Sequence, residues 1–385
     1  MKVKSLPQDF HVEERTEVVP SAGPFALYRL DKQNLTTHDA IAAIVRRWHL
    51  RHDAVSFGGL KDRHATTSQF LTVFQGPPRD LEDRNLRLAF LGHVASRYTS
   101  ADIRGNFFRI TIRDLSETTV QGVLQNANTV RRSGAPNYFD DQRFGSVVGG
   151  EFIARLMVLG RFEDALKLAL TGEYEFDEPA AKREKKAVRK YWARWEKCLL
   201  RIGRGPAQNV IAYLQHHPTD FRGAVTRLWP ESQGLYLAAY QSELWNRMLA
   251  ELIRQRVDES RLLLMPAKTG ELPTPRDLNS DEANQLAALM LPLPSARLRY
   301  EPEAVWAPLV DKVLAQEGFA LNEMKIPGLR KPFFSKGERA GWVRPVDLMA
   351  EAEADDRHAG HQKMTLSFEL PRGSYATIVI KRLML

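Results

Sequence analysis

The chain has 385 residues, of which 43% are hydrophobic and 26% are charged, and its formal net charge is +8. This composition is typical of a folded globular protein and excludes wholesale disorder, and the length predicts one large domain or two to three smaller ones. The positive charge favours a polyanionic partner such as nucleic acid. No run of about 18 apolar residues is present, which excludes a membrane-spanning helix. Residues 1–10 lack the apolar core of a signal peptide, so we expect a cytoplasmic protein.

The sequence offers little support for a metal site or a disulfide. Cys198 is the only cysteine, so neither a disulfide nor a thiolate cluster can form within one chain. We interpret Cys198 as a small buried apolar residue. The ten histidines are scattered and lack the paired spacing of a zinc-binding helix. No metal is therefore expected.

The first 75 residues predict a sheet with one helix. Apolar residues at positions 41, 44, 45 and 48 form a helical stripe, and Thr36 or Thr37 can cap its N-terminus. A polar loop, residues 60–68, carries an unusual density of functional groups. Period-2 alternation or short apolar, β-branched runs predict four strands, at residues 10–13, 25–30, 54–57 and 69–74.

A further strand and helix follow the loop. Residues 107–113 alternate cleanly, which places Phe108, Ile110 and Ile112 on one face of a strand. Ser116 then begins a helix that Gly134 ends.

After residue 150 the pattern changes to helical stretches, of which residues 152–170 and 235–257 are the clearest. The tail returns to apparent strands at residues 364–370 and 375–383, preceded by an acidic run, residues 351–356, that we interpret as a solvated loop. Strands at both ends of a helical block predict an α+β protein with a discontinuous domain. We expect one domain from residues 1–150 and 340–385, and an inserted, mostly helical domain from residues 151–339.

A strongly basic segment lies inside the helical block. Residues 182–197 contain eight Lys or Arg residues, interleaved with Tyr191, Trp192 and Trp195. Cations suit a phosphate backbone and aromatic rings suit unstacked bases, which indicates an RNA-binding helix. The alternative is a solvated amphipathic helix whose aromatic residues belong to the core. The candidate RNA-binding residues are Lys185, Lys186, Arg189 and Lys190.

The loop at residues 60–68 carries the strongest candidate for chemistry. Asp62 lies between Lys61 and Arg63, after two glycines. Neighbouring cations lower the pKa of a carboxyl group and keep it ionised, and an ionised carboxylate can act as a nucleophile or a general base. Lys61 and Arg63 could also bind the phosphates beside a nucleotide. The alternative is an Asp that caps a turn and pairs with Arg63.

Residues 61–69, Lys-Asp-Arg-His-Ala-Thr-Thr-Ser-Gln, resemble the Lys-Asp-(Lys/Arg)-x-Ala-x-Thr-x-Gln motif of the TruD family of pseudouridine synthases. Four other blocks resemble family motifs and occur in the family's order, at residues 4–14, 105–108, 136–145 and 370–377. Each block is moderately specific, and the ordered set is highly specific.

The resemblance implies a pseudouridine synthase fold, a mixed and largely antiparallel sheet flanked by helices, with a TruD-type insertion. It also implies an isomerase that converts uridine to pseudouridine in tRNA, at uridine 13 of the D-arm, without a cofactor. We expect RNA as the partner of a monomer with no obligate protein partner and no membrane association.

The resemblance also assigns roles to individual residues. Asp62 resembles the catalytic aspartate, and Lys4 resembles the basic residue held beside it. Phe108 resembles the aromatic residue that stacks on the target base, and Asn106 resembles the residue that contacts the nucleotide. Tyr375 stands where the family carries another aromatic residue, usually Phe, that faces the same pocket.

Two residues of the block at 136–145 need separate comment. Asp140 replaces the family's usual Gly, and Asp tolerates a positive φ better than most residues if the position requires one. Arg143 can be structural or can contact RNA, and the sequence does not decide between these roles.

Several alternatives remain open. The target uridine must leave the base stack before its ring can turn. Asp62 could attack the sugar, attack the base or remove a sugar proton. An RNA-binding protein or chaperone without catalysis would bind RNA and not convert it. Another RNA-modifying enzyme, such as a methyltransferase, would need a cofactor loop that the sequence lacks, and the same isomerisation could act on another RNA.

Overall fold

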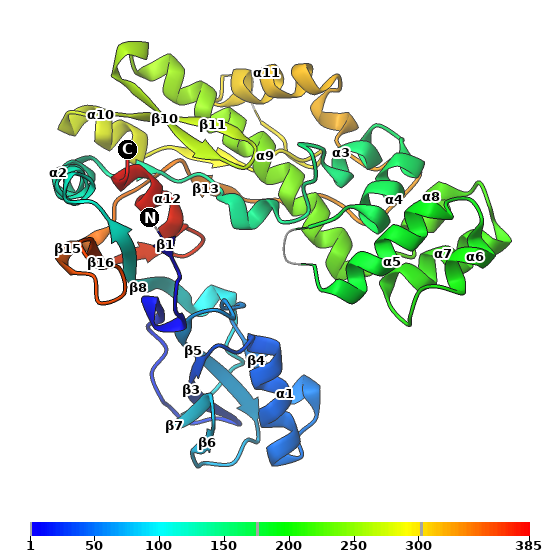
Figure 1. Ribbon diagram of the computed structural model, residues 1–385, viewed down its shortest axis with the longest axis horizontal. Coiled ribbons are helices and arrows are strands. Elements are labelled where there is room, and N and C mark those ends of the chain that lie inside the picture. Colours follow the sequence, from blue (N-terminus) through cyan, green and yellow to red (C-terminus); the bar gives the residue numbers. More distant parts are fainter. Residues whose placement is uncertain (1, 175–176, 301–302) are drawn as a thin grey trace. The chain divides into compact units, whose positions relative to one another are not determined.

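The structure is a computed structural model that describes residues 2–174, 177–300 and 303–385 (Figure 1). The chain divides into two compact units. The first comprises Met1–Asn137, Asp277–Ala287 and Trp342–Leu385, and the second comprises Tyr138–Arg276 and Ala288–Gly341. These boundaries differ from the expected ones at residues 150 and 340. The difference includes the short helix α10 (Ser280–Ala287), which packs on α2 (Glu117–Ser133) of the first unit.

The first unit is built on one mixed sheet. Among the described residues its strand order is β15-β16-β8-β2-β5-β3-β7-β6, with β1 on β8 and β4 on β5. The described neighbours pair antiparallel except β2 and β5, which run parallel. The strands are β1 (Lys2–Val3), β2 (Phe10–Thr16), β3 (Phe25–Gln33), β4 (Val55–Phe57), β5 (Thr66–Phe74), β6 (Leu81–Asp83), β7 (Leu86–Val94), β8 (Ile103–Leu115), β15 (Val346–Ala354) and β16 (Gln362–Pro371).

This arrangement confirms the six strands predicted at residues 10–13, 25–30, 54–57, 69–74, 107–113 and 364–370. The fourth is longer than expected, because β5 begins at Thr66, inside the predicted loop. In β8 the alternation has the expected consequence. Phe108, Ile110 and Ile112 are buried, while Arg109 between them is exposed and Thr111 is partly exposed.

Helices α1 and α2 of the first unit begin at the expected caps, and α2 ends at the expected glycine. In α1 (Thr37–Trp48) the Thr36 side chain accepts a hydrogen bond from the N–H of Asp39. In α2 the Ser116 side chain accepts one from the N–H of Thr119. Gly134 ends α2 with a φ of +79°, and a Cβ there would lie 2.5 Å from the carbonyl oxygen of Val343. Only glycine fits that position without displacing the backbone.

Two expectations for the tail are wrong. Residues 375–383 form no strand, because Ala376–Leu383 is a helix, α12. The run is rich in Ile and Val, which favours the prediction of a strand. The same run also fits a helix, because apolar residues fall at i, i+3, i+4 and i+7, namely Ala376, Val379, Ile380 and Leu383. All four are buried, which is the pattern of a helix packed on a core. Short apolar runs of this kind fit both periods.

The acidic run at residues 351–356 is also not a loop. Its first part continues β15 as far as Ala354, at the edge of the sheet. Asp355 is buried and receives a hydrogen bond from Arg113, as does Asp356. An acidic strand end is stable here because a buried guanidinium of β8 compensates its charge.

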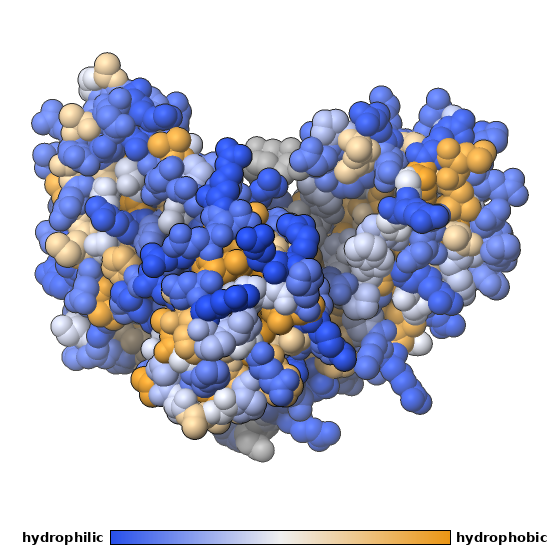
Figure 2. All heavy atoms as spheres, turned by 90° about the horizontal axis from the view of Figure 1, so that it is seen from below, coloured by the Kyte–Doolittle hydropathy of each residue, from blue (hydrophilic) through white to orange (hydrophobic). Residues whose placement is uncertain are grey.

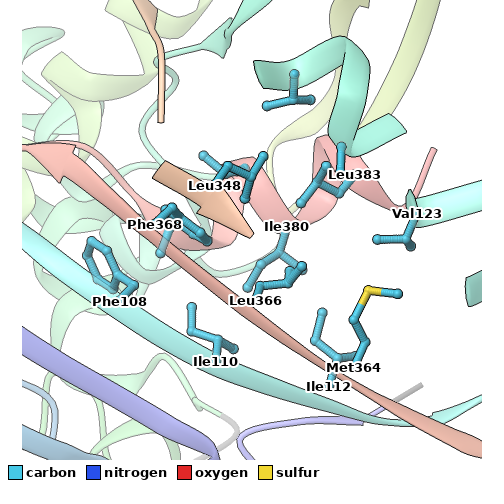
Figure 3. Packing of buried hydrophobic residues seen from close by; sticks show 14 of the residues in the cluster. Phe108, Ile110, Ile112, Val123, Leu348, Met364, Leu366, Phe368, Ile380 and Leu383 are labelled. Carbon is cyan, nitrogen blue, oxygen red and sulfur yellow. The ribbon is translucent and has the colours of Figure 1, made fainter. Parts of the chain in front are cut away.

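The core of the first unit lies between the sheet and its helices. Figure 3 shows side chains of β8 and β16 facing Ile380 and Leu383 of α12. The rings of Phe108 and Phe368 lie 5.7 Å apart within this cluster. A second cluster packs α1 on β3, β5 and β7. Each fully buried side chain of this size contributes roughly 1.5–3 kcal/mol to folding.

The second unit is mostly helical. Its described residues form one hairpin and one further two-stranded antiparallel pair, and no continuous sheet. The predicted helix at residues 152–170 is divided, because Gly160 adopts a φ of +71°. The predicted helix at residues 235–257 is longer than expected. The elements are α3 (Ile153–Val158), α4 (Phe162–Thr171), α5 (Pro179–Lys190), α6 (Trp195–Leu199), α7 (Pro206–His216), α8 (Phe221–Val225), α9 (Pro230–Arg256), α11 (Ala307–Glu317), β10 (Leu262–Ala267), β11 (Gly270–Pro275), β12 (Met290–Pro292) and β13 (Glu338–Ala340).

Two short strands, β9 (Ala135–Pro136) and β14 (Trp342–Val343), pair within the first unit near its junctions with the second. No helix among the described residues is long and apolar enough to cross a membrane. Figure 2 shows hydrophilic side chains over most of the face in view, with apolar ones scattered among them.

Candidate active site

The parallel pairing of β2 and β5 explains why two distant motifs meet. His11 of β2 pairs with Thr66 of β5, and both strands run in the same direction. Parallel neighbours begin at the same edge of a sheet. The segment before β2, which carries Lys4, therefore lies beside the loop before β5, which carries Asp62.

Lys4 and Asp62 form a short ion pair at this edge. Lys4 Nζ lies 2.5 Å from Asp62 Oδ2, and each side chain is 28% exposed. The ammonium also lies 3.9 Å from the centre of the Phe10 ring. A cation at this distance stabilises a negative charge on the carboxylate, and partial burial strengthens the attraction. The carboxylate of Asp62 is thus partly shielded from water and paired with a cation from the N-terminal segment.

The backbone of Lys4 is strained. Its φ is +59°, in the left-handed region that non-glycine residues rarely adopt. Such a conformation costs on the order of 1 kcal/mol and persists where the surroundings impose it. Here His64 Nε2 lies 3.1 Å from the Lys4 carbonyl oxygen, in addition to the ion pair with Asp62. The strain indicates that the direction of the lysine side chain is fixed.

A buried aspartate holds the turn that follows Lys4. In the one-turn 3-10 helix Pro7–Asp9, Asp9 Oδ2 accepts a hydrogen bond of 3.0 Å from the N–H of Leu6. The same carboxylate receives two parallel hydrogen bonds from Arg113 of β8. Asp9 therefore anchors the N-terminal segment to the sheet.

Buried polar side chains fix the backbone of the loop that carries Asp62. Gln69 donates to the carbonyl oxygen of Gly59 at 3.0 Å. Thr37 Oγ1 accepts from the N–H of Lys61 at 3.0 Å and donates to Gln69 Oε1 at 3.0 Å. Thr37 and Gln69 are buried, so these bonds are shielded from water. The loop is preorganised before any substrate binds.

The side chain of Lys61 points into the protein and away from Asp62. Its Nζ lies 2.9 Å from Glu14 Oε2 and 2.5 Å from Asn106 Oδ1, and the side chain is only 10% exposed. Glu14 is fully buried and also accepts from Tyr98 Oη at 3.0 Å and from the N–H of Phe70 at 3.1 Å. The expected contact between Lys61 and RNA phosphate does not fit this geometry. Arg63 is exposed and available to solvent.

Asn106 and Phe108 lie on the strand beside these groups, as expected. Asn106 pairs with Glu14 and Phe108 pairs with Val12 across β8 and β2. Asn106 is half-buried and is held by Lys61. Phe108 is only 7% exposed, and its ring packs edge-on against Phe10 at 6.5 Å. Most of the Phe108 ring therefore belongs to the core, which restricts the face that a base could contact.

Tyr375 is half-buried and immediately precedes α12. It follows the end of β16, where Leu370 pairs with Asn106. Arg143 belongs to the second unit, where its guanidinium lies 5.5 Å from the Phe139 ring. Asp140 has a φ of −101°, an extended conformation, so its replacement of glycine introduces no strain.

In the basic segment the aromatic residues are structural. Trp195 is buried, and Trp192 packs against it at 5.0 Å and donates to Glu163. These contacts favour the interpretation in which the two tryptophans belong to the core of the second unit. Several cations of α5 nevertheless remain exposed to solvent. Cys198 is buried as expected, and burial raises the pKa of its thiol.

Two of the four candidate cations in α5 are engaged in ion pairs. Lys185 is 16% exposed and pairs with Asp177 at 2.6 Å. Arg189 pairs with Glu173 at 3.0 Å. Lys186 and Lys190 are exposed. Arg183, Lys186 and Lys190 fall at i, i+3 and i+7 and share one exposed helix face, which we call the α5 basic face.

Sequence reasoning missed several residues that build the site, chiefly Glu14, Lys32, Thr37 and Gln69. The sequence could have indicated that Lys32 is buried, because it occupies the next alternate position after the buried residues Tyr28 and Leu30 along β3. Burial lowers the pKa of Lys32 to about 8. Among the described residues, no group of three or more His, Cys, Asp or Glu is arranged to hold a metal ion.

The family model described as tRNA pseudouridine synthase D (TruD) matches residues 1–383. "Probable tRNA pseudouridine synthase D 2" of Methanocaldococcus jannaschii is 32% identical over 391 residues, which cover 99% of this chain and 91% of that protein. "tRNA pseudouridine synthase D" of Aquifex aeolicus is 29% identical over 399 residues, which cover 100% of this chain and 98% of that protein.

A crystal structure from Methanosarcina mazei that carries the TruD name superposes with a TM-score of 0.72. It is 24% identical in sequence and covers 100% of this chain and 93% of its own. This likeness confirms the pseudouridine synthase fold predicted from the sequence. Because the family model spans almost the whole chain, the chain belongs to the TruD family, tRNA pseudouridine synthase D.

Proposed function

We propose that this chain, a tRNA pseudouridine synthase by family, isomerises uridine 13 in the D-arm of tRNA, with Asp62 as the catalytic residue and no cofactor. The observation that carries the proposal is the ion pair of 2.5 Å between Lys4 and Asp62. It places a charged carboxylate at the edge of the sheet, on a loop fixed by buried polar side chains. Asn106, on the neighbouring strand, is held by Lys61.

The reaction breaks the bond between N1 of uracil and C1′ of ribose and forms a bond between C5 and C1′. The proton on C5 is released, and N1 gains one, so atoms balance without another reactant. The nucleotide must be flipped out of its stack. Asp62 supplies a nucleophile to the sugar or the base, or accepts a sugar proton. In each case Lys4 stabilises the carboxylate before reaction.

The test is tritium release from a tRNA transcript that contains [5-³H]uridine, because loss of the C5 proton accompanies isomerisation. We expect release from the transcript and no release when cytidine replaces uridine 13. Equal release from both transcripts would reject uridine 13 and retain the reaction. Binding of tRNA without any release from a tRNA pool would reject catalysis and favour a protein that only binds RNA.

We further propose that the first unit carries catalysis and that the α5 basic face of the second unit binds the tRNA backbone. Exposed cations on one helix face suit a row of phosphates. Replacing Arg183, Lys186 and Lys190 together by Glu is expected to weaken tRNA binding about tenfold or more at low salt. Each lost phosphate contact is also expected to reduce the slope of log Kd against log salt by about 1.

Filter binding over a range of salt concentrations measures this effect. The matched control replaces Arg46, Arg47 and Arg84, three exposed cations of the first unit, by Glu, so that both variants change the net charge equally. We expect this control to lower affinity much less, since only its net charge changes. Equal losses in both variants would show that net charge and not the α5 basic face determines binding.

The contribution of Phe108 to base stacking can be separated from its contribution to the core. Phe108→Leu and Phe368→Leu alter two rings of one cluster that lie 5.7 Å apart. We expect both variants to lower the melting temperature, because each leaves unfilled volume in the core. Only Phe108→Leu is expected to lower kcat/KM for tRNA, by roughly tenfold, since stacking on a base contributes about 1–3 kcal/mol. Equal activities would remove Phe108 from substrate binding.

A further inference from the structure

Lys32 is a lysine buried in the core of the first unit. It lies on β3 and is 2% exposed. Its side chain points to the same side of the strand as Tyr28 and Leu30, which pack under α1. Placing an ammonium group in such surroundings costs several kcal/mol unless hydrogen bonds compensate. The contacts of the ammonium therefore indicate why a lysine is present.

The ammonium of Lys32 binds main-chain carbonyl groups. Its Nζ donates to the carbonyl oxygen of Leu35 at 2.7 Å and to that of Asp62 at 2.9 Å, and lies 3.4 Å from that of Lys61. An ammonium has three N–H donors, so the three acceptors match its capacity. The carboxylate of Asp62, by contrast, is engaged by Lys4.

Two of these carbonyl groups flank a single Cα atom. The carbonyl of Lys61 belongs to the peptide group before Asp62, and the carbonyl of Asp62 belongs to the peptide group after it. Fixing both peptide planes fixes the direction of the bond from Cα to Cβ of Asp62. The side chain of Asp62 then projects toward Lys4 in a single conformation of the loop. A displacement of about 1 Å in a reacting group can reduce a rate about a hundredfold.

We propose that Lys32 is a positioning residue that clamps both peptide groups of Asp62 and so sets the geometry of catalysis. The inference rests on the proposed function, in which Asp62 performs the chemistry. The hydrogen bonds of Lys32 go to backbone carbonyl groups and not to the carboxylate of Asp62, so Lys32 acts mainly by holding the backbone of the loop.

The clamp depends on the charge of Lys32. Burial lowers its pKa to about 8, while the negative side chain of Asp62 favours the ammonium and the positive side chain of Lys61 opposes it. A neutral amine has two N–H donors and a lone pair, so it cannot hold three carbonyl groups. The rate is therefore expected to fall as the pH rises through about 8.

The stability of the protein should change in the opposite sense. The pKa of Lys32 is about 8 in the folded state, below its usual value of 10.5, so the unfolded chain binds more protons between these values. The contribution of Lys32 to the free energy of unfolding consequently increases with pH across this window. Loss of activity without loss of stability separates release of the clamp from alkaline unfolding.

The experiment compares Lys32→Met and Lys32→Arg with the wild type in single-turnover tritium release and in tRNA filter binding. We expect Lys32→Met to lower the rate about a hundredfold at pH 7, with Kd changed less than about threefold. Its rate should not vary between about pH 7 and pH 9.5. Lys32→Arg retains charge and donors and should recover part of the rate. A rate for Lys32→Met within about threefold of the wild type would overturn the proposal.

A matched control and a second readout distinguish the possible failures. Leu88→Ala removes a fully buried side chain from the same cluster and is expected to lower the melting temperature and keep the rate. Hydrogen exchange at residues 59–65 should accelerate in Lys32→Met and not in Leu88→Ala. Unchanged exchange would overturn the clamp. An inactive wild type with accelerated exchange in Lys32→Met would reject the proposed function and retain the clamp.

Discussion

Replacing Asp62 by Asn is expected to abolish tritium release from [5-³H]uridine tRNA, with a loss of at least about 10³-fold in single-turnover rate. The amide has the size of the carboxylate but carries no charge, so it cannot act as a nucleophile or a base at neutral pH. Lys4 would also lose its counterion, since its Nζ lies 2.5 Å from Asp62 Oδ2. Binding of tRNA should change little, because one ion pair at the edge of the sheet is exchanged for a hydrogen bond.

The control for this experiment is Asp53→Asn. Asp53 is an exposed aspartate of the same unit and pairs with Arg51 on the surface. An exposed pair contributes little to stability, so this variant should keep both activity and melting temperature. If Asp62→Asn released tritium as fast as the wild type, Asp62 would have no part in the reaction, and the proposed mechanism would be rejected.

Replacing Arg113 by Met is expected to lower the free energy of unfolding by roughly 3–5 kcal/mol at pH 7. The Arg113 side chain is 7% exposed and binds Asp9 and Asp355, whose side chains are 4% and 0% exposed. Removing the guanidinium leaves Asp9 without its cation and leaves Asp355 with His358 as its remaining side-chain partner. The N-terminal segment should loosen as well, because Asp9 anchors the turn that follows Lys4.

The effect of Arg113→Met should depend on pH. Burial alone would raise the pKa of Asp355, but hydrogen bonds from the N–H groups of Asp114 and Arg357 and from the side chains of His358 and Arg113 outweigh it and lower that pKa well below its usual range. A carboxyl group with a lowered folded-state pKa stabilises the protein above its unfolded pKa, and this contribution is lost as the pH falls. The difference between variant and wild type should therefore shrink below about pH 4.

Urea unfolding at pH 7 and at pH 3 measures both expectations. The matched control is Arg104→Met, which removes an exposed arginine of the same strand that pairs with exposed Glu17. This change should alter stability by less than about 1 kcal/mol. Equal losses in the two variants would indicate that the buried network contributes no more than a surface pair.

Local patterns in the sequence were sufficient for six strands of the sheet and for helices α1 and α2 of the first unit. Alternation at Phe108, Ile110 and Ile112 located β8, and Thr36 and Ser116 located two helix starts. These signals are local, because a side chain two to four residues away shares the same face. The acidic run at residues 351–356 failed because the residue that stabilises it, Arg113, lies 242 residues away from Asp355. No local pattern records such a partner.

The candidate site was predicted only in part for a related reason. The resemblance to family motifs predicted that Lys4 lies beside Asp62, and the two side chains are in contact in the structure. Lys61 was expected to bind an RNA phosphate because it adjoins Asp62 in sequence. Successive loop residues project in different directions, and Glu14 draws Lys61 inward. Lys32 could not be found from chemistry alone, since its partners are carbonyl groups that every residue possesses.

The pairing of β8 with β16 has a consequence for synthesis of the chain on the ribosome. Ile110 pairs with Leu366, and α12 covers the same cluster. While the second unit is being translated, one edge of β8 has no strand to pair with and its apolar face is not covered, because residues 362–383 have not yet been synthesised. The nascent chain therefore carries an unpaired strand edge while the residues between β8 and β16 are translated, and such an edge favours aggregation.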